Sequence, residues 1–309
     1  MGFCKHFFAG RWPESALTKG HDCNKDNLNL KQMDALVLKQ KTLEAILKKY
    51  GSLAVAFSGG VDSTFLLAVA KFVFADALRL LAVTVVSPLH HEKDMMFAET
   101  FARQNNIRHI SLRSDEMMSE AFLRNPPDRC YICKKMVFRI IMEAAQQAGI
   151  ETVAHGENVD DGRAYRPGMR AAEEMGIIAP LADAGLTKDD IRRLSRQMGL
   201  ATWNQPASGC LATRIPYHSP ITLEKLQMVA SAEQVLEGLG FPISRVRHHG
   251  DLAKIEVPEE MLEKLLVPSV RRPLLEAFKQ IGFRYVSLDL EGHQSGRLER
   301  SIHSLSDPV

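Results

Sequence analysis

The fold of this chain is indicated by residues 53–64, which read LAVAFSGGVDST. An apolar run leads into two glycines, and a helical pattern follows over residues 65–70. A strand that enters a glycine turn and then a helix aims several backbone N–H groups, and the positive end of the helix dipole, at one point. Glycines let the backbone approach an anion closely because they have no Cβ. The stretch therefore predicts a phosphate-binding loop.

Two other nucleotide-binding loops are excluded by the spacing of this stretch. The P-loop motif needs a lysine, but none occurs between Gly51 and Lys71; the dinucleotide motif needs separated glycines, whereas Gly59 and Gly60 are adjacent. The string SGGVDS instead resembles the pyrophosphate loop of the ATP pyrophosphatase (PP-loop) superfamily. This resemblance implies that the chain binds ATP, adenylates an acceptor oxygen and releases pyrophosphate. The alternative is an ordinary glycine turn between a strand and a helix.

Backbone N–H groups and hydroxyls of this loop are expected to hold the pyrophosphate. A carboxylate such as Asp62 is unusual beside phosphate unless it holds Mg²⁺. Asp161, in the stretch GENVDD at 156–161, is a second candidate for Mg²⁺ or ribose, and a solvated helix N-cap is the alternative. The predicted nucleotide-binding residues are Ser58, Gly59, Gly60, Asp62, Ser63 and Thr64.

Length and composition are those of a globular protein with an ample core. The chain has 309 residues, of which 45% are hydrophobic and 25% charged, and a formal net charge of +2. This weak charge gives little support for a nucleic-acid partner. No apolar run reaches the length of a bilayer span, and no apolar signal core develops before Arg11 and Pro13. We therefore expect a cytoplasmic protein without a membrane partner.

Apolar runs alternate with helical patterns in the first half of the chain. Helical spacing occurs at 31–50, 92–103 and 130–148, and strands are predicted at 53–57, 78–86, 107–112 and 151–156. Strands separated by helices imply an α/β fold, in which helices cover both faces of a parallel sheet. Ligands of such sheets bind at the carboxyl ends of the strands, where the phosphate loop and Gly156 both fall.

Three regions are predicted along the chain. Residues 1–30 mix Gly, Pro, Asn, Asp and Lys without a period, which predicts a loose N-terminal extension. Residues 31–216 are expected to form the ATP-binding domain. A helix at 222–239, a hairpin over 244–250 and 253–257, two more helical stretches and a strand at 283–290 predict a small C-terminal α+β domain over 217–309.

The cysteines are the second strong signal. There are five, an odd count that argues against a complete disulfide framework. Cys130 and Cys133 form a C-x-x-C pair, and Cys210 lies far along the chain. The three thiols could hold a [4Fe-4S] cluster with one open iron, zinc together with a histidine such as His155 or His218, or a redox disulfide that leaves Cys210 unexplained. The alternative is that all three are buried apolar residues.

Two arginines alternate on one predicted strand. Arg245 and Arg247 point to the same side of it, so their guanidinium groups could together bind a phosphate or a carboxylate. On spacing alone, solvated surface arginines are the more common outcome.

Several stretches together resemble one family of PP-loop enzymes, the ATP-dependent sulfur transferases of nickel-pincer cofactor synthesis known as LarE. The matching stretches are residues 58–64, 156–161, 166–168 (RPG), 206–216 (PASGCLATRIP), 245–250 (RVRHHG) and 288–296. These ordered runs span nearly everything after Leu30, which makes them far more specific than any single motif.

The resemblance implies a reaction and its ligands. The family adenylates a carboxylate of a pyridinium mononucleotide and replaces the activated oxygen with sulfur to make a thiocarboxylate. Some members sacrifice the sulfur of a cysteine in the Cys-Leu-Ala segment, and others add a C-x-x-C and relay sulfide from a three-cysteine [4Fe-4S] cluster. This chain has both pieces and looks like the cluster type, in which Cys210 is a ligand. ATP, Mg²⁺, the cluster, a sulfide source and the mononucleotide would then be required.

The resemblance also implies residue roles. Cys210 and Asp62 would be catalytic, Asp62 and Asp161 would hold Mg²⁺, and the three cysteines would hold the cluster. The substrate phosphate would be gripped by Glu233, Arg245 and Arg247. We also expect a homo-oligomer.

Other functions compatible with the sequence are a PP-loop enzyme with a different acceptor, or a non-catalytic nucleotide-binding module with structural zinc. A tRNA thiolase needs a sizeable basic surface, which the net charge does not favour. An amide-forming ligase needs a source of ammonia and would leave the three cysteines idle.

Overall fold

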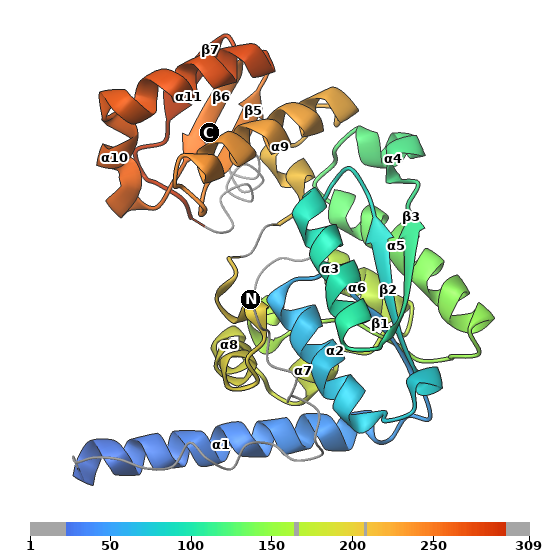
Figure 1. Ribbon diagram of the computed structural model, residues 1–309. Helices are drawn as coiled ribbons and strands as arrows, with labels where there is room; N and C mark the ends of the chain where they lie inside the picture. The colour runs from blue at the N-terminus through green and yellow to red at the C-terminus, as the bar shows by residue number, and fades with distance from the viewer. Residues whose placement is uncertain (1–22, 164–166, 207–208, 295–309) are drawn as a thin grey trace, which may run out of the picture.

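A four-stranded parallel sheet forms the centre of the larger unit (Figure 1). The computed structural model describes residues 23–163, 167–206 and 209–294. The strands are β1 (Leu53–Ala56), β2 (Leu80–Val86), β3 (Arg108–Arg113) and β4 (Val153–Ala154), in the order β3-β2-β1-β4. Every pairing between them is parallel. The predicted α/β class is confirmed, although β4 is shorter than the expected strand at 151–156.

Helices cover both faces of this sheet because its strands alternate their side chains between two apolar clusters. Val55 packs with one set of helices, and its neighbour Ala54 packs with the other. The first set is α1 (Cys23–Leu47), α2 (Val61–Val73), α3 (Glu92–Gln104), α7 (Pro180–Asp183) and α8 (Lys188–Gln197). The second set is α5 (Arg129–Gln147) and α6 (Pro167–Glu174). A one-turn helix, α4 (Glu120–Leu123), precedes α5.

The N-terminal extension was predicted to reach residue 30, but α1 begins at Cys23. Residues 23–30 are therefore helical, and the prediction is wrong for them. These residues lack an apolar period, yet no Gly or Pro interrupts the chain between Cys23 and Tyr50, so nothing breaks the helix there. Residues 1–22 lie outside the described part of the chain.

A second, smaller unit begins with α9 (Leu223–Gly238). The predicted hairpin is present as β5 (Arg245–His249) and β6 (Leu252–Glu256), and β7 (Tyr285–Leu288) pairs in parallel with β6. Helices α9, α10 (Leu262–Leu266) and α11 (Pro268–Ile281) pack on this mixed sheet around their own apolar cluster. Figure 1 shows the unit set apart from the larger sheet. The boundary between residues 216 and 217 remains a prediction.

None of the described helices is long and apolar enough to cross a membrane.

The strand order contains one switch point, between β1 and β4. The chain runs from β1 outward to β2 and β3, and then returns to place β4 on the other side of β1. A crevice forms at the carboxyl ends of two strands where the order reverses in this way. The loops after β1 and β4 meet there, because a Cβ on Gly156 would lie 2.9 Å from Ser63 N and 3.2 Å from Asp62 C.

Gly156→Ala is expected to lower the free energy of unfolding by about 1–3 kcal/mol, because its new methyl group overlaps backbone atoms of α2. Urea denaturation would measure the change. Gly51→Ala is the matched control, since a Cβ there meets nothing within 4 Å, and a change within about 0.5 kcal/mol is expected. Equal losses in both variants would contradict the close approach.

Candidate active site

The phosphate loop connects β1 to α2 and holds two serine hydroxyls together. Gly59 has a left-handed φ of 76°, and a Cβ there would lie 2.6 Å from Asp94 O. Gly60 then caps the N-terminus of α2. Ser58 Oγ and Ser63 Oγ lie 3.0 Å apart, and Ser63 Oγ donates to Gly60 O at 3.2 Å. The loop thus gathers backbone N–H groups and hydroxyls at the positive end of a helix, as phosphate binding requires.

Thr64 follows Ser63 in the first turn of α2. Its side chain is fully buried, and among the described residues its Oγ1 has no hydrogen-bond partner. The assignment of Thr64 to the nucleotide remains a prediction.

Asp62 lies at the crevice with a carboxylate that two other segments contact. Lys188 Nζ, at the first residue of α8, donates to Asp62 Oδ2 at 2.5 Å, and Asn158 Nδ2 lies 3.5 Å from Oδ1. Burial raises the pKa of Asp62, and Lys188 partly offsets this effect. Asp161 raises the same pKa further, which shows that the two carboxylates interact. A pair of carboxylates held this way suits a divalent cation.

The segment after β4 is held in place by its own side chains. Asp161 Oδ2 accepts a hydrogen bond from Asn158 N at 3.0 Å, and Asp160 Oδ2 accepts one from Lys188 N at 2.8 Å. Lys188 was not among the site residues predicted from the sequence. A capping box formed by Thr187 and Asp190 places it at the start of α8, and this helix-start signal was available in the sequence.

The structure brings the three predicted cysteines into one neighbourhood. Cys130 and Cys133 lie three residues apart in the first turns of α5, which places them on one side of the helix. Cys210 directly precedes a short 3₁₀ turn, Leu211–Arg214, and Leu211 N donates to Leu89 O at 2.8 Å just beyond the end of β2. Cys133 and Cys210 pack against the same apolar cluster, and all three thiols are free and half-buried.

Burial favours the protonated form of two of these thiols, Cys133 and Cys210. It raises the pKa of Cys133 well above its usual value, and nearby Cys210 and Glu116 raise it further. Burial also raises the pKa of Cys210, and Cys130 adds to that effect. Cys133 Sγ donates to Oε1 of the fully buried Glu116 at 3.6 Å. Within the described ranges, no three His, Cys, Asp or Glu side chains are arranged to hold a metal ion.

Glu233, predicted to help grip a substrate phosphate, is instead occupied by protein groups. Its carboxylate accepts two hydrogen bonds from the Arg214 guanidinium at 2.8 and 3.0 Å and one from Val246 N at 3.0 Å. His91 Nε2 lies 3.3 Å from Glu233 Oε2, and the Glu233 side chain is only 6% exposed. The sequence could not predict this, because Arg214 and Glu233 meet only when α9 packs against the turn after Cys210.

Arg245 and Arg247 lie beside this pair on one side of β5, as predicted. Arg247 forms a fork with Glu256 at 3.0 and 2.8 Å and donates to Thr213 O at 2.7 Å. Burial, together with the positive charges of Arg214 and Arg247, lowers the pKa of Arg245 to about 10. Three guanidinium groups thus gather near the Cys210 turn, where an anion would relieve their repulsion.

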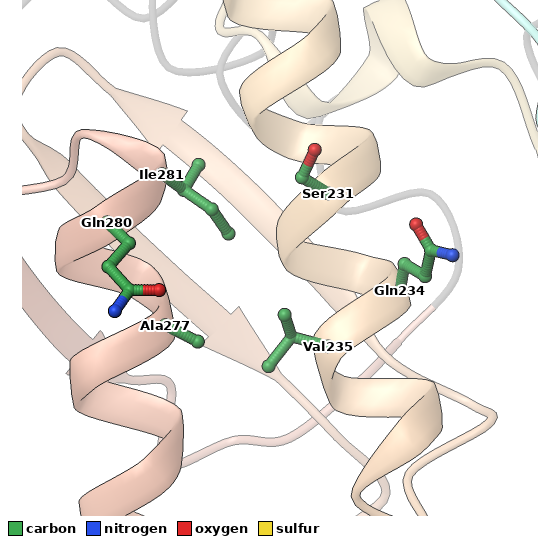
Figure 2. A pocket seen from close by; sticks show the side chains of 6 residues that line it. All are labelled: Ser231, Gln234, Val235, Ala277, Gln280 and Ile281. Carbon is green, nitrogen blue, oxygen red and sulfur yellow. The ribbon is translucent and has the colours of Figure 1, made fainter.

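A pocket between α9 and α11 lies elsewhere and includes none of the predicted site residues. Figure 2 shows the residues that line it: Ser231, Gln234, Val235, Ala277, Gln280 and Ile281.

Because of Glu233, the free energy of unfolding is expected to fall at acidic pH. Burial alone would raise its pKa, but His91 and Arg214 outweigh burial and hold that pKa at about 2, below the usual 4.5. This contribution to the free energy of unfolding is therefore complete above about pH 4.5 and is lost as the pH falls towards 2.

Glu233→Gln should be less stable than the unmodified protein by about 3–5 kcal/mol at pH 7, because it leaves Arg214 without a buried counter-charge. Urea denaturation from pH 7 to pH 3 should show this deficit shrinking below pH 4.5. Glu237→Gln, at an exposed position of the same helix, is the control. A deficit that does not change with pH would contradict the assignment.

Comparison with known proteins identifies relatives along almost the whole chain, although no family model matches it. It is 39% identical to an uncharacterised protein of Synechocystis over 266 residues. This alignment covers 85% of the present chain and 98% of the Synechocystis protein. It is 35% identical over 270 residues to the pyridinium-3,5-bisthiocarboxylic acid mononucleotide synthase of Lactiplantibacillus plantarum. This alignment covers 87% of the present chain and 97% of the synthase. It is 28% identical over 206 residues to a component of the glutamine-hydrolysing GMP synthase of Thermoplasma acidophilum, over 62% of this chain and 64% of that one.

The last relative, an ATP-using enzyme of the PP-loop superfamily, agrees with the fold of the larger unit. The synthase from Lactiplantibacillus plantarum matches both units at an identity that shows common family membership. The chain therefore belongs to the family of pyridinium-3,5-bisthiocarboxylic acid mononucleotide synthases (LarE), within the PP-loop superfamily.

Proposed function

We propose that this chain uses ATP to activate a carboxylate of a pyridinium mononucleotide and then inserts sulfur, which gives a thiocarboxylate for the nickel-pincer cofactor. The observation that carries this proposal is the position of two loops at one edge of the sheet. The phosphate loop follows β1. The segment that contains Cys210 is hydrogen-bonded through Leu211 N to Leu89 O, just beyond the end of the neighbouring strand β2. In this proposal the activating site and the sulfur site are therefore near each other.

Activation requires a better leaving group than an oxide ion. The substrate carboxylate attacks the α-phosphorus of ATP, pyrophosphate leaves, and AMP becomes the group that sulfur later displaces. The Ser58 and Ser63 hydroxyls and the N-terminus of α2 are suited to hold the departing pyrophosphate. Lys188 contacts Asp62 at the same loop, so its positive charge would also act on the pyrophosphate. When bound at Asp62 and Asp161, Mg²⁺ would neutralise the phosphate oxygens.

Sulfur insertion is assigned to Cys130, Cys133 and Cys210, which we call the three-cysteine centre. Cys133 and Cys210 pack against the same apolar cluster, and Cys130 lies near enough to affect the pKa of both, so a metal bound by all three would displace the thiol protons that burial retains. We propose that they hold a [4Fe-4S] cluster, whose open iron would supply a bound sulfide. Cys133 would turn from Glu116 and give up its proton to serve as a ligand. A sulfur nucleophile then attacks the activated carbon, and AMP leaves with the former carboxylate oxygen.

The substrate phosphate is assigned to the arginines of β5. Arg245 and Arg247 lie next to Arg214 and the Cys210 turn, so a phosphate bound there would bring the mononucleotide towards the three-cysteine centre. Glu233 is not part of this grip. Its role in the proposal is to hold Arg214, which in turn donates to Cys210 O at 3.1 Å.

The reaction can be tested by anaerobic incubation with ATP, Mg²⁺, sulfide and the mononucleotide. Mass spectrometry should find AMP, pyrophosphate and a substrate in which one oxygen is replaced by sulfur. Release of ADP would contradict the assigned chemistry. Conversion of Cys210 to dehydroalanine would show that this cysteine is consumed as the sulfur donor and is not a lasting ligand.

Asp62→Asn is expected to lower the rate of pyrophosphate release by about a hundredfold or more, because it removes the carboxylate assigned to Mg²⁺. A coupled pyrophosphate assay would measure this rate. Asp189→Asn, at an exposed position next to Lys188, is the control and should retain the rate. A rate unchanged in Asp62→Asn would remove Asp62 from the proposed machinery.

Cys133→Ser is expected to separate the two halves of the reaction. It should retain release of pyrophosphate with the mononucleotide but lose most of the thiocarboxylate and the bound iron, because only the sulfur half uses this thiol. Iron analysis and product analysis of the same sample would measure both effects. Full sulfur transfer by the variant would exclude Cys133 from the centre.

A further inference from the structure

Residues 89–94 form a short segment that contacts three separate parts of the proposed site. The segment runs from just beyond the end of β2 into the first turn of α3. At its start, Leu89 O accepts a hydrogen bond from Leu211 N at 2.8 Å, in the turn that carries the sulfur site. At its end, Asp94 O lies so near the phosphate loop that a Cβ on Gly59 would be 2.6 Å from it.

His91 lies between these two contacts and reaches the smaller unit. It occupies the N-cap position of α3, where Ser, Thr, Asp or Asn usually bind the free N–H groups of the first turn. Within the described part of the chain its side chain makes no such bond, and His91 Nε2 instead lies 3.3 Å from Glu233 Oε2 in α9. The two side chains are only 17% and 6% exposed. An imidazole N–H can donate to a carboxylate whether the ring is charged or neutral, so the contact does not require a protonated histidine.

Glu233 connects His91 to the arginines assigned to the substrate phosphate. Its Oε1 accepts a hydrogen bond from Val246 N at 3.0 Å, and Val246 lies between Arg245 and Arg247 on β5. The same carboxylate holds Arg214 through two hydrogen bonds. A shift of the Glu233 carboxylate would therefore move the backbone that carries both arginines of β5.

A second ion pair joins the same two helices, one turn further along α9. Lys93 Nζ lies 2.6 Å from Glu237 Oε2, but these side chains are 53% and 47% exposed. Exposed pairs of this kind contribute little, because water screens them and both side chains lose freedom when they pair. The largely buried contact of His91 is therefore the one suited to fix α3 against α9.

We propose that His91 is a positioning residue for the substrate phosphate. It holds Glu233, and through Glu233 the strand β5, at a set distance from the phosphate loop, so that the carboxylate of the mononucleotide meets the α-phosphorus of ATP. Alignment of this kind matters greatly, since a displacement of about 1 Å can cost about a hundredfold in rate. The inference deepens the proposed function and rests on it for the identity of the substrate.

The first test measures the KM of each substrate through release of pyrophosphate. His91→Ala removes the donor to Glu233, and His91→Gln retains an N–H donor at a similar reach. Lys93→Ala breaks the exposed pair between the same helices and is the matched control. His91→Ala should raise the KM for the mononucleotide about tenfold and leave the KM for ATP within about twofold. His91→Gln should restore most of the loss, and Lys93→Ala should behave like the unmodified protein.

A merely structural role for His91 predicts a different result. His91→Ala would then contain less folded protein and show a lower kcat and Tm, while the KM for the mononucleotide would equal that of the unmodified protein. That result would overturn the inference.

A second test needs no substrate and separates this inference from the proposed function. Hydrogen–deuterium exchange of the ligand-free protein, followed by peptide mass spectrometry, measures how firmly each strand is held. In His91→Ala, amides of β5 should exchange about tenfold faster, because the carboxylate that binds Val246 N loses a partner, whereas amides of β1 should keep their rates.

The outcomes of the second test distinguish the two failures. Faster exchange at β5 in a protein that makes no thiocarboxylate would reject the proposed function and leave the placement of β5 by His91 standing. Unchanged exchange at β5 in an active protein would reject the inference alone.

Discussion

The close approach of two backbone segments is the constraint on which the site depends. Gly156, after β4, lies so near the first turn of α2 that a Cβ would be 2.9 Å from Ser63 N. The strand order reverses between β1 and β4, so the loops after these two strands meet at the crevice. The contact brings Asn158 and Asp161 to Asp62, and α8 then adds Lys188. One glycine therefore lets four charged or polar groups from three segments share one site.

A second constraint is the placement of buried charge between the two units. Arg214 and Glu233 are both nearly inaccessible to water, so the pair persists only because its carboxylate is fully hydrogen-bonded. The pair links the turn after Cys210 to α9 and β5. The small C-terminal unit thus supports the backbone that carries Cys210, and it also carries the arginines that we propose to bind the substrate phosphate. Family membership agrees with this coupling, since the synthase relative matches both units along its whole length.

Most of the fold could be predicted from local patterns. The apolar runs at β1, β2 and β3, and the hairpin at β5 and β6, carry strong periodicity, and the structure places them within two residues of the expected bounds. Predictions failed where the pattern was weak. Helix α1 starts before its apolar period begins. Strand β4 was expected over 151–156, but it pairs with β1 through Val153 and Ala154 alone. Periodicity reports which side chains are buried, and it does not report how far a hydrogen-bond ladder extends.

By itself, the sequence determined the phosphate loop, its position between a strand and a helix, and the identity of the three cysteines. These follow from residues adjacent in the chain, whose backbone geometry is local. Only the tertiary structure decided that Thr64 is buried, that Lys188 contacts Asp62 and that Glu233 pairs with Arg214. Pairing and desolvation depend on groups that lie far apart in sequence, and packing alone brings them together.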